Sequence, residues 1–145
     1  MKRNKTFSAK PEKIERKWYI VDASDKILGR LATKISLILR GKDEEIFTPS
    51  CDTGDFVIVV NASKIKVSGK KMTDKAYFTH SMYPGGAKSI NFEDQLKKDP
   101  TKIILHAVRG MLPTGRLGDK LITKLKVFSD DKYPHSAQKP EVLDI

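Results

Sequence analysis

The sequence predicts an α/β fold of three layers around a small mixed or parallel sheet, and two observations carry this prediction. A β-branched and aromatic segment, an amphipathic helical segment and a continuous apolar segment follow one another over residues 18–60, which is the order of a βαβ unit. The length of 145 residues suits one domain with a buried core. Within it we expect a basic arm at residues 1–16, an α/β core at 17–128 and an extended tail at 129–145.

The first half of the core holds the most regular predicted elements. The β-branched and aromatic run WYIVD at residues 18–22 predicts a strand. Apolar side chains at three- and four-residue steps predict a helix over residues 27–41, which ends at Gly41. The apolar run FVIVV at residues 56–60 predicts a strand covered on both faces, as in parallel sheets. Alternation in KIKVS, residues 64–68, predicts a shorter strand.

The second half is predicted to be less regular. Residues 68–86 are basic and aromatic and end in a Pro-Gly-Gly turn, so we expect a long functional loop. Residues 91–99 predict a short helix. An Asp-Pro start and a terminal glycine predict a second helix over residues 99–110. A third helix is expected at residues 118–125 and a last strand at 126–128.

The net charge is +10, and the excess of basic residues is concentrated in two segments. Residues 1–17 carry seven basic and two acidic residues, and residues 101–128 carry six basic and one acidic residue. Such concentrated charge attracts polyanions, chiefly nucleic acid or an anionic membrane, although solubility alone also explains a basic surface. We expect no membrane span and no secretory signal, because no apolar run is long enough. The single cysteine, Cys51, excludes an intramolecular disulfide and fits a reducing compartment.

The stretch GMLPTGRLG, residues 110–118, has the G-x-x-x-x-G spacing of a P-loop without the residues that a P-loop requires. A P-loop follows a strand and continues with a lysine and a hydroxyl residue that bind phosphate and magnesium. Here the glycines follow a predicted helix, and Arg116 and Leu117 come next. Pro113 also lacks the N–H group that a phosphate nest uses. The sequence therefore disfavours a nucleotide triphosphatase.

Other chemistry-bearing patterns are equally incomplete. The Asp-Thr-Gly at residues 52–54 resembles an aspartic protease motif, but a loop carboxylate that orients a turn or pairs with a nearby lysine is the favoured interpretation. His80, His106 and His135 lie far apart in the sequence, with no ligand at metal-binding spacing. We predict no catalytic residue, no metal site and no cofactor, and hence no enzyme.

Nucleic acid binding explains more of the sequence. Cations recur four residues apart on helices and beside glycines in loops, where the backbone can approach phosphate closely. Rings at residues 77–83 alternate with lysines and could stack on unpaired bases. Core packing of Tyr77 and Phe78, and merely solvated helix faces, are the alternatives. The cations are Arg30 with Lys34, Lys120 with Lys124, Lys70 and Lys71 after Gly69, Arg109 before Gly110, and Arg116 after Gly115.

Seven ordered blocks cover nearly the whole chain: WYIVDASDKILGRLAT, LRGKDEEIFTP, DTGDFVIVVNASKIKVSGKK, HSMYPGG, VRGMLPTGRLG, LKVF and HSAQKP. Together they resemble the bacterial type of large-subunit ribosomal protein L13, although no one block would be specific alone. The resemblance implies an α/β/α fold around a four-stranded, mostly parallel sheet. It also implies a non-catalytic structural protein that binds large-subunit rRNA of the 23S type and assists early subunit assembly.

The partners implied are large-subunit rRNA and neighbouring large-subunit ribosomal proteins, with neither DNA nor a membrane. The location implied is a ribosome, in a bacterial cytoplasm or in a plastid or mitochondrion. An RNA-binding translational regulator outside the ribosome is the alternative. The resemblance and the charge pattern together give these candidate RNA-binding residues: Lys2, Arg3, Lys5, Lys10, Arg16, Lys17, Arg30, Lys34, Arg40, Lys42, Lys70, Lys71, Lys75, Tyr77, His80, Arg109, Arg116, Lys120, Lys124, Lys126 and His135.

The chain departs from the family pattern at a few positions. Thr114 and Asp119 stand where basic residues are usual, and Tyr83 stands where arginine is frequent. The Ser-Cys pair at residues 50–51 replaces a commoner pair that contains histidine. Family contacts are therefore not carried over to Tyr83, Thr114 or Asp119.

Overall fold

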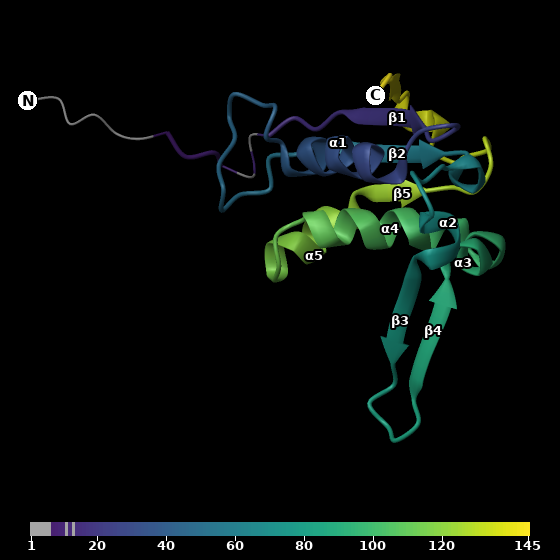
Figure 1. Cartoon of the computed structure of the whole chain (residues 1–145). Helices are drawn as coiled ribbons and strands as arrows, with labels where there is room; N and C mark the ends of the chain where they lie inside the picture. Colours follow the sequence, from purple (N-terminus) through teal and green to yellow (C-terminus); the bar gives the residue numbers. More distant parts are fainter. Residues whose placement is uncertain (1–6, 11, 13) are drawn as a thin grey trace, which may run out of the picture.

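The computed structural model describes residues 7–10, 12 and 14–145 (Figure 1). Its strands and helices are β1 (Trp18–Asp22), α1 (Leu28–Arg40), β2 (Phe56–Val60), the 3-10 helix η2 (Ala62–Lys64), α2 (Lys71–Asp74), β3 (Ala76–His80), β4 (Ala87–Asn91), α3 (Phe92–Lys98), α4 (Pro100–Met111), α5 (Arg116–Thr123), β5 (Leu125–Val127), the 3-10 helix η3 (Ser136–Gln138) and β6 (Glu141–Val142).

Four strands form one sheet in the order β5-β2-β1-β6, and every pair in it is parallel. The α/β class and the four-stranded sheet are therefore confirmed. Strand β1 lies in register with β2, with Trp18 opposite Phe56. The fourth strand, β6, comes from the C-terminal tail and pairs with β1 at Tyr19 and Ile20.

The helices α1 and α4 cover one face of this sheet. Right-handed crossovers from β1 to β2 and from β2 to β5 step in the same direction across the sheet, so both helices fall on the same side. The two helices pack against each other, and Figure 1 shows α4 and α5 side by side along the body. The core between them is fully apolar: Val21, Leu31, Ile35, Leu39, Val57, Val59, Phe92, Ile103, Ile104 and Val108 are completely or almost completely buried.

The tail covers rings on the opposite face of the sheet. Side chains alternate along a strand, so Trp18 and Phe56 point away from Val57 and the helices. Their rings stack with centroids 4.3 Å apart and planes 6° from parallel. The tail brings His135 to 5.6 Å from the Trp18 ring, and Phe128 lies 5.8 Å from the same imidazole. The tail is thus part of the packed structure.

The predicted helix boundaries are largely confirmed. Helix α1 ends at Gly41, which adopts a left-handed conformation with φ 73°. Asp99 caps α4 by accepting a hydrogen bond from the N–H of Thr101, and Pro100 is the first helical residue. The predicted end at Gly110 is wrong, because α4 continues to Met111. A glycine costs a helix only about 1 kcal/mol, which the packing of α4 outweighs.

Two predictions in the middle of the chain are wrong. Residues 64–68 form no strand, because Asn61 turns the chain at φ 57° into η2 and only the single bridge from Lys66 to Ile27 follows. The predicted loop at residues 68–86 instead contains α2 and the first strand of an antiparallel hairpin, β3–β4. The hairpin projects from the body (Figure 1), so both of its faces are largely exposed and its sequence lacks the alternation of a half-buried strand.

Candidate nucleic-acid interface

The exposed face of α1 carries two cations near the start of the helix. Arg30 and Lys34 are four residues apart, so they lie one turn above each other on the same face. Both are exposed, and neither has a carboxylate partner in the part of the chain that the structure describes. The first turn holds no acidic residue, so the positive end of the helix dipole adds to their charge.

The connection between α4 and α5 presents a second group of cations. Gly115 turns the chain at φ 96°, and α5 begins at Arg116 rather than at the predicted Gly118. Arg116 and Lys120 are one helical turn apart and exposed. Asp119 lies beside them, with its Oδ1 atom 3.8 Å from Nη2 of Arg109. A pair this long and this exposed is weak, so Arg109 remains available to another anion.

The glycine spacing in this connection serves packing. A Cβ atom on Gly118 would lie 1.8 Å from the carbonyl oxygen of Pro113, so only glycine lets the start of α5 approach the loop. The N–H of Asp119 is already used by the carbonyl of Gly115 at 3.1 Å. The loop therefore closes on itself through its own backbone, in contrast to a P-loop, whose amides face a phosphate.

A third group of cations precedes the hairpin. Gly69 adopts φ 61°, and Lys70 and Lys71 follow it at the start of α2, where both are exposed. Lys75 is half-buried at the end of this short helix, and its Nζ atom lies 5.4 Å from the centre of the Tyr77 ring. These three lysines are close in sequence and lie on one side of the hairpin base.

The remaining predicted cations before β2 are in mixed situations. Lys10, Lys17 and Lys42 are exposed. Arg16 forms an ion pair with Asp52 at 3.3 Å, and Arg40 is half-buried with its guanidinium 5.7 Å from the Phe47 ring. The predicted contacts at Lys2, Arg3 and Lys5 lie outside the described residues.

The prediction that Lys124 binds RNA is wrong. Its side chain is buried, and its ammonium donates hydrogen bonds to the carbonyls of Leu39 at 3.1 Å and Gly54 at 2.8 Å and to a carboxylate oxygen of Asp52. The four-residue spacing from Lys120 does not extend one exposed stripe, because α5 ends at Thr123 and Lys124 turns inward. The predicted pairing of the Asp-Thr-Gly carboxylate with a lysine is confirmed by this contact.

Three predicted ring contacts and Lys126 are also partly engaged within the protein. Tyr77 packs against the core, which confirms the alternative interpretation of this ring. The Nδ1 atom of His80 accepts a hydrogen bond from the N–H of Met82 at 2.9 Å. His135 packs between two rings of the sheet face, and Lys126 is half-buried on β5.

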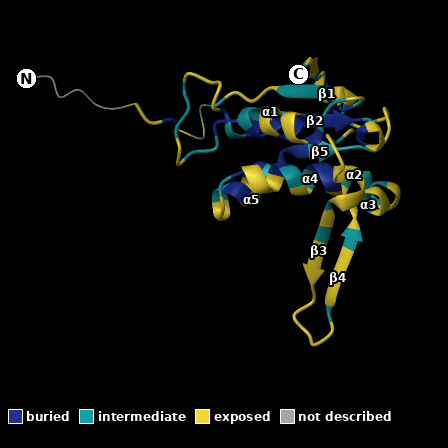
Figure 2. Cartoon of the chain, viewed as in Figure 1, coloured by how far each residue is buried: buried dark blue, intermediate teal, exposed yellow. Residues whose placement is uncertain are grey.

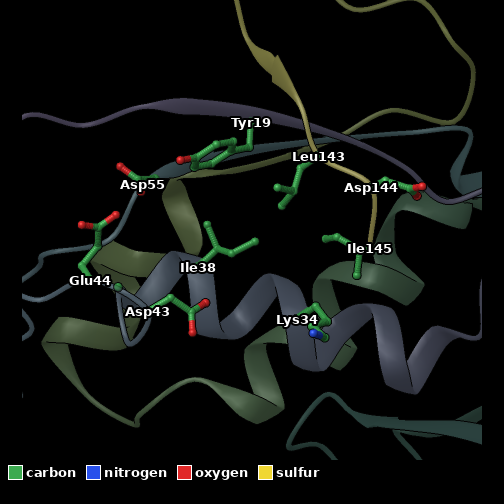
Figure 3. Close-up of a pocket in the computed structure, with 10 residues that line it drawn as sticks. Tyr19, Lys34, Ile38, Asp43, Glu44, Asp55, Leu143, Asp144 and Ile145 are labelled. Atoms are coloured by element: carbon green, nitrogen blue, oxygen red, sulfur yellow. The ribbon is translucent and has the colours of Figure 1, made fainter.

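One pocket has the wrong charge for phosphate. It has a volume of about 300 Å³ and lies beside β1 and α1 (Figure 3). Three carboxylates, of Asp43, Glu44 and Asp55, stand around the Tyr19 ring there. Burial raises the pKa of Tyr19 above its ordinary value, and the charge of Asp55 raises it further. This part of the surface repels a polyanion, although Lys34 also lines it.

Two further basic side chains on α4 were missed by the sequence prediction. Lys102 and His106 are exposed and share a stripe of the helix with Arg109, because the three residues follow at steps of four and three. The buried residues of the same helix, Ile103, Ile104 and Val108, face the core. The polar stripe at helical spacing was the available signal, and it was read only at its last member.

The fold and this distribution of charge define the class of the molecule: a one-sheet α/β protein whose exposed cations on several elements suit a polyanionic partner. No helix in the described part of the chain is long and apolar enough to cross a membrane. A family model described as Ribosomal protein L13 matches residues 16–134. The chain belongs to the ribosomal protein L13 family.

Curated relatives match over almost their full length. The chain is 54% identical over 142 residues to the large ribosomal subunit protein uL13 of Symbiobacterium thermophilum, which covers 98% of this chain and 99% of that protein. It is 58% identical over 141 residues to the protein of the same name from Chlorobium phaeobacteroides, covering 97% and 94%. The corresponding protein of Aeromonas salmonicida is 55% identical over 141 residues, covering 97% and 99%.

Proposed function

We propose that this protein is a structural constituent of the large ribosomal subunit that binds 23S-type rRNA and assists early subunit assembly. One observation carries the proposal: six exposed cations on three separate elements have no carboxylate partner among the described residues. These are Arg30, Lys34, Lys70, Lys71, Arg116 and Lys120. The names of the relatives, matched over nearly their whole length, support the choice of the large subunit.

The proposed mechanism is electrostatic. Each lysine or arginine that contacts a phosphate releases a condensed counterion, so affinity is high at low salt and falls steeply as salt increases. Contacts of this kind fix the position of the protein on a folded RNA and carry little base recognition. Neighbouring ribosomal proteins complete its surroundings, and the protein's role in this setting is structural rather than catalytic.

The test compares two double variants that remove equal charge. In Arg116→Ala with Lys120→Ala, two unpaired cations are lost. In Lys66→Ala with Lys97→Ala, two equally exposed cations are lost that pair with carboxylates at 2.6 and 2.7 Å. Binding of each full-length variant to a large-subunit rRNA fragment is measured by filter retention from about 50 to 200 mM salt.

We expect the first variant to bind more weakly and its slope of log affinity against log salt to fall by about two, or one for each phosphate contact. The control variant should keep a slope close to that of the unchanged protein. Both should melt within a degree or two of it, because exposed side chains contribute little to stability. Equal losses for both variants, or a salt-independent affinity, would contradict the proposal.

A further inference from the structure

A groove separates the base of the hairpin from the body of the protein. It has a volume of about 370 Å³, within the range of pockets that hold small ligands. Strand β3 forms one wall and the exposed stripe of α4 forms the other, with Ile122 of α5 also lining it. Figure 2 shows the hairpin projecting beside these helices with mostly exposed residues.

Tyr77 fixes the wall that β3 contributes. Its ring lies 6.4 Å from the buried ring of Phe92 and meets the imidazole of His106 edge-on, with centroids 5.4 Å apart and planes at 89°. Burial of the hydroxyl raises the pKa of Tyr77 above its ordinary value, so the ring remains neutral. The hairpin base is thus held at a set distance from α4.

The next residue, Phe78, lines the same groove but is not covered by the protein. It is 69% exposed, and the residue opposite it across the hairpin is the small Ser89. Burial of a phenylalanine ring stabilises a protein by about 1.5–3 kcal/mol, which this position forgoes in the free protein. An exposed ring beside a groove therefore indicates a partner that covers it.

The opposite wall is cationic. Lys102, His106 and Arg109 line the groove from α4. Two carboxylates approach these cations: Asp99 lies 3.3 Å from the ammonium of Lys102, and Asp119 lies 3.8 Å from Arg109. Asp99 is already occupied by the backbone and hydroxyl of Thr101 at the start of α4, and both pairs are largely exposed, so an incoming phosphate can compete for the cations.

We propose that this groove binds one unpaired nucleotide of RNA, with its base on the ring of Phe78 and its phosphate on Arg109 and Lys102. A flat ring opposite a row of cations is the combination by which proteins hold single-stranded nucleic acid. Residues 75–92 contain no carboxylate, which favours an anionic partner over a basic peptide. This proposal rests on the proposed RNA function and adds an unpaired base to a binding mode otherwise made of phosphate contacts.

The experiment compares Phe78→Ala with Tyr83→Ala in the full-length protein. Tyr83 is a matched control, because it is an aromatic residue of the same hairpin, is 74% exposed and does not line the groove. The probes are a labelled uridine decamer and a labelled RNA duplex of about 16 base pairs, which offers no unpaired base. Affinities are measured by fluorescence anisotropy at one fixed salt concentration.

We expect Phe78→Ala to weaken binding of the single strand on the order of tenfold and to leave duplex binding within twofold, while Tyr83→Ala changes neither. In a second measurement, a 4-thiouridine in the decamer should crosslink to residues of β3 or α4. Equal effects of the two variants, or crosslinks confined to other elements, would overturn the groove assignment.

The same measurements separate this proposal from the proposed function. If the unchanged protein binds the rRNA fragment with a steep salt dependence but Phe78→Ala has no effect on the decamer, only the groove assignment fails. If neither rRNA nor the decamer is bound, both proposals fail. If Phe78→Ala leaves all RNA binding intact and instead abolishes binding of a neighbouring ribosomal protein, the groove holds a protein side chain and our assignment is wrong.

Discussion

Replacement of Lys124 by methionine provides the sharpest test of how the core is assembled. The side chain is 4% exposed, and its ammonium joins three segments: the end of α1 at Leu39, the loop at Asp52 and Gly54, and the start of β5. Burial lowers the pKa of Lys124 below its ordinary value, while the charge of Asp52 opposes that shift. Methionine preserves the apolar stem and removes the charge and all three donors.

The expected loss is about 3 kcal/mol. Removal of one partner of a buried ion pair typically costs 3–5 kcal/mol, because the other charge is left without compensation. Here the lower end applies, since Asp52 is 18% exposed and retains Arg16 at 3.3 Å. In a domain of this size each kcal/mol corresponds to roughly 2–4 °C, so the melting temperature should fall by about 6–12 °C.

Calorimetry and urea unfolding measure this loss, with Lys120→Met as the control. Lys120 lies one turn earlier on the same stretch of chain but is exposed, so its replacement should change stability by less than about 0.5 kcal/mol. Adding Asp52→Asn to Lys124→Met should cost less than the sum of the two single changes, because the unpaired carboxylate is then gone. A Lys124→Met protein that melts within 2 °C of the unchanged one, on the order of the control, would refute the reasoning.

Two further predictions concern the start of α4 and the loop that precedes α5. Asp99→Ala should destabilise the protein by about 1 kcal/mol at pH 7, because the cap hydrogen bond to Thr101 is lost. That hydrogen bond lowers the pKa of Asp99 below its ordinary value near 3.8, so its contribution is complete above that pH and disappears as the pH falls through the lower folded value. Urea unfolding at pH 7 and pH 2.5 should therefore give a difference between the two proteins that shrinks in acid, and a constant difference would count against the cap. Gly118→Ala should cost about 1–3 kcal/mol in thermal unfolding, because the added methyl group meets the carbonyl of Pro113; unchanged melting would show that the loop yields freely.

Local patterns in the sequence predicted the first βαβ unit well. The apolar period of α1, the glycine at its end and the Asp-Pro start of α4 act over a few residues, and each is visible without knowledge of the fold. The hairpin at residues 76–91 was missed because its two faces are exposed and leave no alternating pattern. The division into arm, core and tail stays a prediction, although the tail supplies β6 to the sheet.

The site was predictable in composition but not in detail. Charge counts located Arg30, Arg116 and Lys120, all of which the structure leaves exposed. The burial of Lys124 depends on Leu39 and Gly54, which lie 85 and 70 positions away along the chain, so no local pattern could indicate it. The groove beside Phe78 depends in the same way on a hairpin and a helix that meet only in three dimensions.

The position of β6 determines the order in which the sheet can be completed. Strand β1 is made within the first 22 residues, yet one of its edges has no partner until residues 141–142 are available. At 5–20 residues per second, synthesis exposes this edge for roughly 6–24 s. An unpaired strand edge is a template for pairing with other chains. A nascent chain that stalls before its last turn of synthesis therefore carries an adhesive edge, and release of the finished chain is the event that seals it.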